Sequence, residues 1–80
     1  MPYQPITIKD ILKNTRFVGD VQRETRIKNA YKLAFEAHKE QKRKSGEDYI
    51  QHPLHTALTL AKIGMGSKTI SAGLLHDVPE

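Results

Sequence analysis

Cysteine is absent from this 80-residue chain, and long apolar runs are absent as well. Without a thiol the chain forms neither a disulfide nor a thiolate–zinc site, so histidine and oxygen must hold any metal. No apolar run approaches the roughly 20 residues of a membrane span, and the start, MPYQPITIKD, lacks the pattern of a secretory signal. We therefore expect a soluble, cytoplasmic chain without a membrane partner.

The positive charge of the chain is unevenly distributed. Residues 16–44 hold nine basic and four acidic residues, whereas the other positions hold four basic and five acidic ones. A basic surface attracts nucleic acid, phosphorylated metabolites or anionic lipid, although a solvated helix face is the commoner explanation. Residues 16–44 contain few aromatics for base stacking and match no recognition motif, so we do not expect a nucleic-acid partner.

The apolar pattern is helical almost throughout, which predicts an all-α fold. Thr7 and Asp10 resemble a capping box that opens a short helix through Leu12. Asp20 is expected to cap a long helix that runs to about Lys42. One face of that helix is predicted to be buried: Ile27, Ala30, Tyr31, Ala34, Ala37, His38 and Gln41.

Two further helices are predicted in the second half of the chain. His52 and Pro53 are expected to begin the first of them, with His52 at the cap position. Its apolar residues are Leu54, Ala57, Leu58, Leu60, Ala61 and Ile63. Gly64 ends it, Gly66 permits a tight turn, and Ser67 is expected to cap the last helix. That helix stops abruptly, so we expect further helices to be missing and the chain to self-associate or to be partly disordered.

His76 and Asp77, in the segment LLHDVPE, are adjacent groups that can bind one divalent metal. His52 in YIQHP adds a second imidazole, and Glu80 adds a carboxylate one turn past His76. Metal-assisted hydrolysis needs such a set, because the ion lowers the pKa of water and a carboxylate manages protons. Taken singly, each residue is more often a helix cap or a solvated surface group.

The segment RKSGEDYIQHP, residues 43–53, places cations close to the candidate metal. Arg43 and Lys44 end a predicted helix, where the carbonyl dipole favours positive charge, so a structural role is open to them. A guanidinium also stacks on a base or forks onto a phosphate, and lysine supplies a point charge. Ser45 and Gly46 turn the chain back toward His52, which points to a phosphorylated substrate.

These segments carry a family resemblance. AYKLAFEAHKEQKRKSGEDYIQHPLHTALTLAKIG followed by ISAGLLHDVPE, within residues 27–80, resembles the N-terminal HD hydrolase domain of the RelA/SpoT alarmone enzymes. The resemblance implies that residues 1–80 are about the first half of one HD-domain helical bundle. It also implies an intact protein that hydrolyses guanosine tetra- and pentaphosphate at the ribose 3′ diphosphate, releasing pyrophosphate.

The functional residues of the family are assigned only to positions of this chain that match its motifs. The resemblance implies that His52, His76 and Asp77 are the first three ligands of a Mn²⁺ ion. Glu80 matches the first member of the Glu-Asp pair that deprotonates the attacking water. The loop that packs on guanine and phosphate corresponds to Arg43, Lys44 and Ser45.

The chain departs from the family pattern in ways that bear on activity. The paired Asp and a fourth ligand, an Asp much further downstream, lie beyond Glu80, so we expect the 80-residue chain to be inactive or weakly active alone. Three other readings stay open: a non-catalytic remnant or regulatory helical domain, a small basic helical module that binds nucleic acid through residues 16–44, and an HD phosphohydrolase of another nucleotide. Nucleic-acid binding would show itself by a steep salt dependence without a metal requirement.

Overall fold

The structure is a computed structural model that describes residues 5–39, 49–76 and 78. Within these ranges the chain forms α-helices without a strand, which confirms the predicted all-α class. The helices are α1 (Ile8–Asn14), α2 (Val21–His38), α3 (Gln51–Lys62) and α4 (Ser67–Leu75). None of them is long and apolar enough to cross a membrane.

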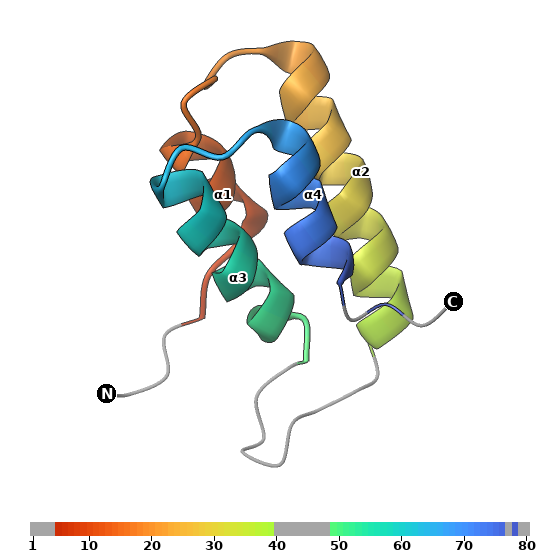
Figure 1. Cartoon of the computed structure of the whole chain (residues 1–80). Coiled ribbons are helices and arrows are strands. Elements are labelled where there is room, and N and C mark those ends of the chain that lie inside the picture. The colour runs from red at the N-terminus through yellow and green to blue at the C-terminus, as the bar shows by residue number, and fades with distance from the viewer. Residues whose placement is uncertain (1–4, 40–48, 77, 79–80) are drawn as a thin grey trace.

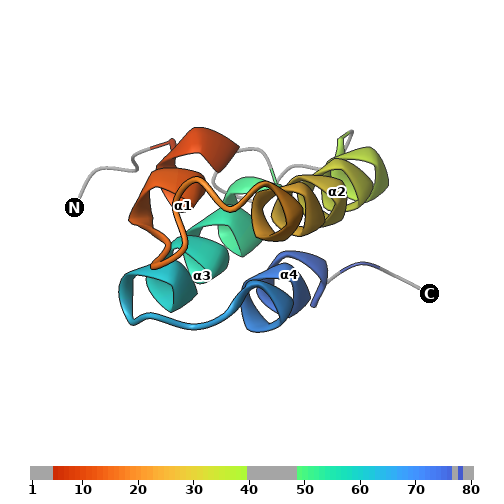
Figure 2. The ribbon, with the colours of Figure 1, turned by 90° about the horizontal axis from the view of Figure 1, so that it is seen from above.

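The four helices run alternately up and down. The α1–α2 and α3–α4 loops lie at one end, where α2 and α4 begin, and α3 begins at the opposite end (Figure 1). Helix α4 packs against α2 and α3, and α1 packs against both α3 and α2. In the view from above, α1 and α2 lie in the upper part of the picture, and α3 and α4 lie in the lower part (Figure 2). This order brings the last turns of α2 and α4 to the same end as the first turn of α3.

Side-chain caps begin the first two helices, as the sequence predicts. The Thr7 N–H donates to Asp10 Oδ2 at 2.8 Å, within a capping box. The Asp20 carboxylate accepts the Arg23 N–H at 3.0 Å. These backbone hydrogen bonds favour the ionised acid and hold the pKa of Asp10 and of Asp20 below the usual 3.8.

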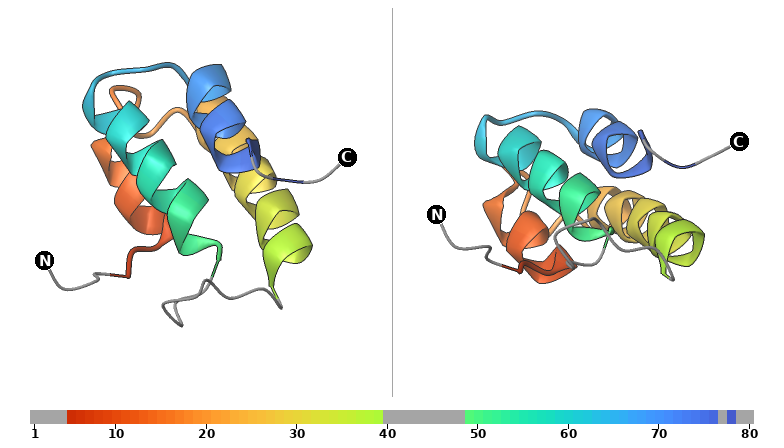
Figure 3. Two further views of the ribbon diagram at one scale, coloured as in Figure 1. Left: turned by 60° about the horizontal axis from the view of Figure 1, so that its bottom comes forward. Right: turned by 90° about the horizontal axis from the view of Figure 1, so that it is seen from below.

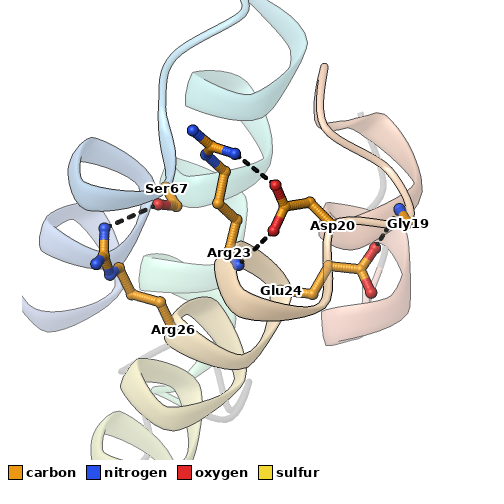
Figure 4. Close-up of polar contacts among 6 residues, drawn as sticks. All are labelled: Gly19, Asp20, Arg23, Glu24, Arg26 and Ser67. Carbon is orange, nitrogen blue, oxygen red and sulfur yellow. Dashed lines mark hydrogen bonds and ion pairs between the residues drawn. The ribbon is translucent and has the colours of Figure 1, made fainter.

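Several polar contacts lie at the start of α2, and one of them reaches the start of α4 (Figure 4). The Arg23 guanidinium pairs with the Asp20 carboxylate, and Arg26 Nη1 donates to the buried Ser67 Oγ at 3.2 Å. The Gly19 N–H donates to Glu24 Oε2 at 2.9 Å. The Arg23 contact stays at the start of α2, whereas the Arg26 contact links α2 to the first residue of α4.

The core lies between the four helices and contains the apolar faces that the sequence predicts. Its buried residues are Ile11, Ile27, Ala30, Ala34, Ile50, Leu54, Ala57, Ala61, Ile70 and Leu74. Tyr31, Leu58 and Leu60 pack at its edge. Two predicted members are exposed instead. Ala37 is on the solvent side of α2, and Ile63, 62% exposed, follows the last residue of α3.

Three predicted helix ends are wrong. Helix α2 ends at His38 and not near Lys42. Helix α3 begins at Gln51 with Ile50 as its cap, so His52 lies inside the first turn. That start is possible because Pro53 remains in the first turn, where its missing N–H removes no helical hydrogen bond.

The cap of α4 is also one residue earlier than predicted. Gly66 occupies the cap position with extended backbone at φ −76°, and Ser67 is the first helical residue. The Ser67 hydroxyl accepts from Arg26, whereas a cap residue would accept from the backbone of its own helix. Gly64, at φ +85°, has the left-handed conformation that ends α3, as predicted.

Candidate metal centre

The alternating helix directions bring the last turns of α2 and α4 to the same end of the bundle as the first turn of α3 (Figure 3). His38 is the last residue of α2, His52 the second residue of α3, and His76 the cap residue that follows α4. His38 is buried at 2% exposure, His52 is half-buried and His76 is exposed. The fourth histidine, His55, is on the exposed side of α3, as the sequence predicts.

The two predicted histidine ligands lie next to each other. The ring centres of His52 and His76 are 5.3 Å apart, with the ring planes inclined at 60°. With a metal–nitrogen bond of about 2.1 Å, a ring centre lies roughly 3.2 Å from the metal, so neighbouring ligand rings have centres about 4.5–5.2 Å apart. The observed separation is close to that range, so the two imidazoles fit a shared divalent ion.

The His76 ring is oriented by the backbone of its own helix. Its Nδ1 lies 2.6 Å from the carbonyl oxygen of Gly73. Because a carbonyl only accepts, Nδ1 must carry the proton, and in the neutral ring Nε2 carries the lone pair. Metal-binding histidines commonly donate their second ring N–H to such an oxygen, which fixes the tautomer. The hydrogen bond also satisfies a carbonyl in the last turn of α4.

His52 is held by contacts with a residue before α3 and with a residue one turn further along it. Its backbone N–H donates to the Tyr49 carbonyl at 3.1 Å, and its own carbonyl accepts from Thr56 Oγ1 at 3.2 Å. The Tyr49 ring meets the His52 ring edge-on, with centres 6.4 Å apart. The sequence pattern does not assign Tyr49 to the site, because a single tyrosine three residues before His52 forms no recognisable motif.

The remaining predicted site residues lie outside the described part of the chain. They are Arg43, Lys44, Ser45, Asp77 and Glu80. Among residues 5–39, 49–76 and 78, no three histidine, aspartate or glutamate side chains form a metal-binding group. The assignment of His52, His76 and Asp77 as ligands, of Glu80 as the proton acceptor, and of Arg43, Lys44 and Ser45 as the nucleotide loop stays a prediction.

A second gathering of polar groups lies at the far end of the bundle. Gln22, Arg23 and Arg26 line a small hollow there. It lies beside the start of α2, whereas α2 ends at His38, near the two candidate ligands. The described structure therefore offers the histidine end as the candidate site.

Comparison with known proteins shows the family that the chain resembles. A family model described as the HD domain matches residues 30–80. The guanosine-3′,5′-bis(diphosphate) 3′-pyrophosphohydrolase of Aquifex aeolicus is 59% identical over 54 residues, which cover 68% of this chain and 8% of that protein. Both His52 and His76 lie within the range that the family model matches.

Two other similar proteins are named for different activities. The bifunctional (p)ppGpp synthase/hydrolase SpoT of Escherichia coli is 47% identical over 55 residues, covering 69% of this chain and 8% of that protein. The GTP pyrophosphokinase of Streptomyces coelicolor is 43% identical over 83 residues, covering 99% of this chain and 10% of that protein. The chain thus spans a tenth or less of the length of these relatives.

Proposed function

Since the chain belongs to the HD domain family, we propose that it forms part of a Mn²⁺-dependent hydrolase that removes the 3′ diphosphate of guanosine tetra- and pentaphosphate. Relatives named for that hydrolysis support the substrate class. The observation that best supports metal-dependent chemistry is the pairing of His52 with His76, at 5.3 Å between ring centres. The reaction is proposed to take place in the cytoplasm.

The proposed ligand set rests on the resemblance, and the ring geometry supports it for His52 and His76. His52 and His76 hold the ion, His76 through Nε2 because Nδ1 donates to Gly73. Asp77 contributes a carboxylate oxygen, and two imidazoles with one carboxylate suit a first-row divalent metal. When bound, such an ion acidifies water and polarises phosphoryl oxygens.

The chain's own residues then manage the proton and the nucleotide. Glu80 accepts the proton of the water that attacks the phosphorus bonded to the ribose 3′ oxygen. The bond between that phosphorus and the 3′ oxygen breaks, the 3′ oxygen takes a proton, and pyrophosphate is released. Arg43 stacks on guanine or forks onto phosphate, Lys44 supplies a point charge, and Ser45 belongs to the same proposed nucleotide loop.

The proposal is tested by measuring pyrophosphate released from guanosine tetraphosphate by the 80-residue chain with Mn²⁺. We expect slow, Mn²⁺-dependent release that His76→Ala abolishes and that His55→Ala, a change of a surface histidine on α3, leaves intact. Release that persists in His76→Ala would contradict the proposal. So would the absence of both Mn²⁺-dependent release and Mn²⁺ binding at His52 and His76.

The names of two relatives favour a second candidate function, that of a non-catalytic regulatory domain. The matched Streptomyces proteins are named GTP pyrophosphokinases. In a protein of that kind the same helices would serve as a non-catalytic regulatory domain. This candidate predicts binding of guanosine tetraphosphate without Mn²⁺-dependent turnover, and a panel of other nucleotides in the same assay would test the guanine preference.

A further inference from the structure

Gln51, the residue before His52, joins the start of α3 to the N-terminal segment. The Ile6 N–H donates to Gln51 Oε1 at 2.8 Å, and Gln51 Nε2 donates to the Ile6 carbonyl at 2.9 Å. Gln51 is buried, so both hydrogen bonds are partly shielded from water. One amide thereby satisfies a backbone donor and a backbone acceptor, and two bonds resist rotation of the first turn better than one.

His38, the last residue of α2, is the second residue that supports the start of α3. Its ring is buried at the end of α2 and lies 4.6 Å from the Tyr49 ring, centre to centre, with the planes inclined at 32°. The Tyr49 ring in turn meets the His52 ring at 6.4 Å. The packed rings therefore run from α2 through Tyr49 to His52, and then to His76 at 5.3 Å.

We propose that Gln51 and His38 are positioning residues that hold His52 against His76. The expected effect on metal affinity rests on the proposed function. The expected effect on the contact between the His52 and His76 rings does not require a metal. Neither residue is assigned a ligand role, because Gln51 is bonded to Ile6 and the His38 ring packs on Tyr49.

The position of His52 explains why such support is needed. The first turn of a helix lacks backbone acceptors for its N–H groups and frays readily. The Ile50 cap of α3 provides no side-chain cap hydrogen bond. Apart from the backbone bond from His52 to Tyr49, side-chain contacts hold a ligand in that turn, and loss of such outer contacts typically weakens metal binding about 10–100-fold.

The first variant is Gln51→Met, which preserves length and removes both hydrogen bonds. Two further variants change His38: His38→Leu removes the aromatic ring, and His38→Phe retains an aromatic ring. Ile27→Val is the matched control, since it weakens the core at a position of α2 eleven residues before His38. Two quantities are measured on the 80-residue chain: the nuclear Overhauser effect between the His52 and His76 rings, and the Mn²⁺ dissociation constant from water-proton relaxation.

We expect Gln51→Met and His38→Leu to reduce the inter-ring effect at least twofold and to weaken Mn²⁺ binding about 10–100-fold. His38→Phe should rescue both quantities, and Ile27→Val should lower the melting temperature while leaving both unchanged in the folded protein. Should His38→Leu not fold, Gln51→Met alone decides the outcome. Unchanged values in Gln51→Met, or equal losses in Ile27→Val, would overturn the inference.

The outcomes separate this inference from the proposed function. An inter-ring effect in the unsubstituted chain without Mn²⁺ binding would count against the proposed metal chemistry, while the variants would still test positioning through the ring contact. Absence of the inter-ring effect in the unsubstituted chain would overturn the inference itself. Binding of Mn²⁺ that the variants do not alter would leave the proposed function standing and refute the role of Gln51 and His38.

Discussion

His76 donates its Nδ1–H to the carbonyl of Gly73, three residues earlier in α4, across 2.6 Å. This contact leaves Nε2 as the lone-pair nitrogen of the neutral ring. We predict that at alkaline pH the His76 ring has its proton on Nδ1, detected in long-range ¹⁵N–¹H correlation spectra. A ring that carries its proton on Nε2 would contradict the geometry of the candidate site.

The core should be sensitive to small losses of volume at Ile27, which is fully buried in α2. Ile27→Val is expected to lower the free energy of unfolding by about 0.5–1.5 kcal/mol, and Ile27→Ala by about 2–5 kcal/mol. Val21→Ala, at a position 74% exposed, should change it by less than about 0.5 kcal/mol. Urea denaturation followed by circular dichroism measures all three, and equal effects at Ile27 and Val21 would refute the burial.

The glycines of the α3–α4 loop should respond in opposite directions to the same substitution. Gly64 has φ +85°, where a side chain is strained, so Gly64→Ser should destabilise the chain by about 1 kcal/mol. Gly66 caps α4 with extended backbone, and Gly66→Ser should stabilise it by a few tenths of a kcal/mol. Melting temperatures of the two variants check this, and a loss at Gly66 larger than at Gly64 would contradict the loop geometry.

Acid should remove part of the stability that the cap of α2 provides. The Arg23 backbone N–H, and then its side chain, lower the pKa of Asp20 below 3.8 in the folded chain. A depressed carboxyl pKa contributes stability that is present above about pH 3.8 and is lost as the pH falls through the folded value. Asp20→Asn retains a cap, so it should flatten the decline in melting temperature below pH 3.8.

A control at the other cap sharpens the pH prediction. Asp10 also has a lowered pKa, first through the Thr7 backbone N–H. Asp10→Asn should therefore flatten the acid decline separately, and the double substitution should flatten it further. Identical acid profiles for Asp20→Asn and the unsubstituted chain would show that this cap does not link stability to pH.

The elements that follow local rules were predictable from the sequence. The Thr7–Asp10 capping box and the Asp20 cap are short-range signals, and both are confirmed. The buried face of α2 was also recognisable, because its spacing matches the helical repeat. His38 was identified correctly as an interior residue for the same reason.

The contacts between distant parts of the chain were not predictable from the pattern. The bond between Gln51 and Ile6 joins residues 45 positions apart, and no local rule marks either one. The nearness of His52 and His76 depends on α3 and α4 packing side by side in opposite directions, which the sequence indicated only through the family resemblance. Roles for Asp77 and Glu80 stay predictions, because these residues lie outside the described structure.

The most direct test of the account is the Mn²⁺ dissociation constant of the 80-residue chain, compared with those of His76→Ala and His55→Ala. We predict that His76→Ala weakens binding at least tenfold, because it removes one of two neighbouring imidazoles, and that His55→Ala leaves binding unchanged. Equal affinity in His76→Ala and the unsubstituted chain would contradict the assignment of the metal to the histidine end of the bundle.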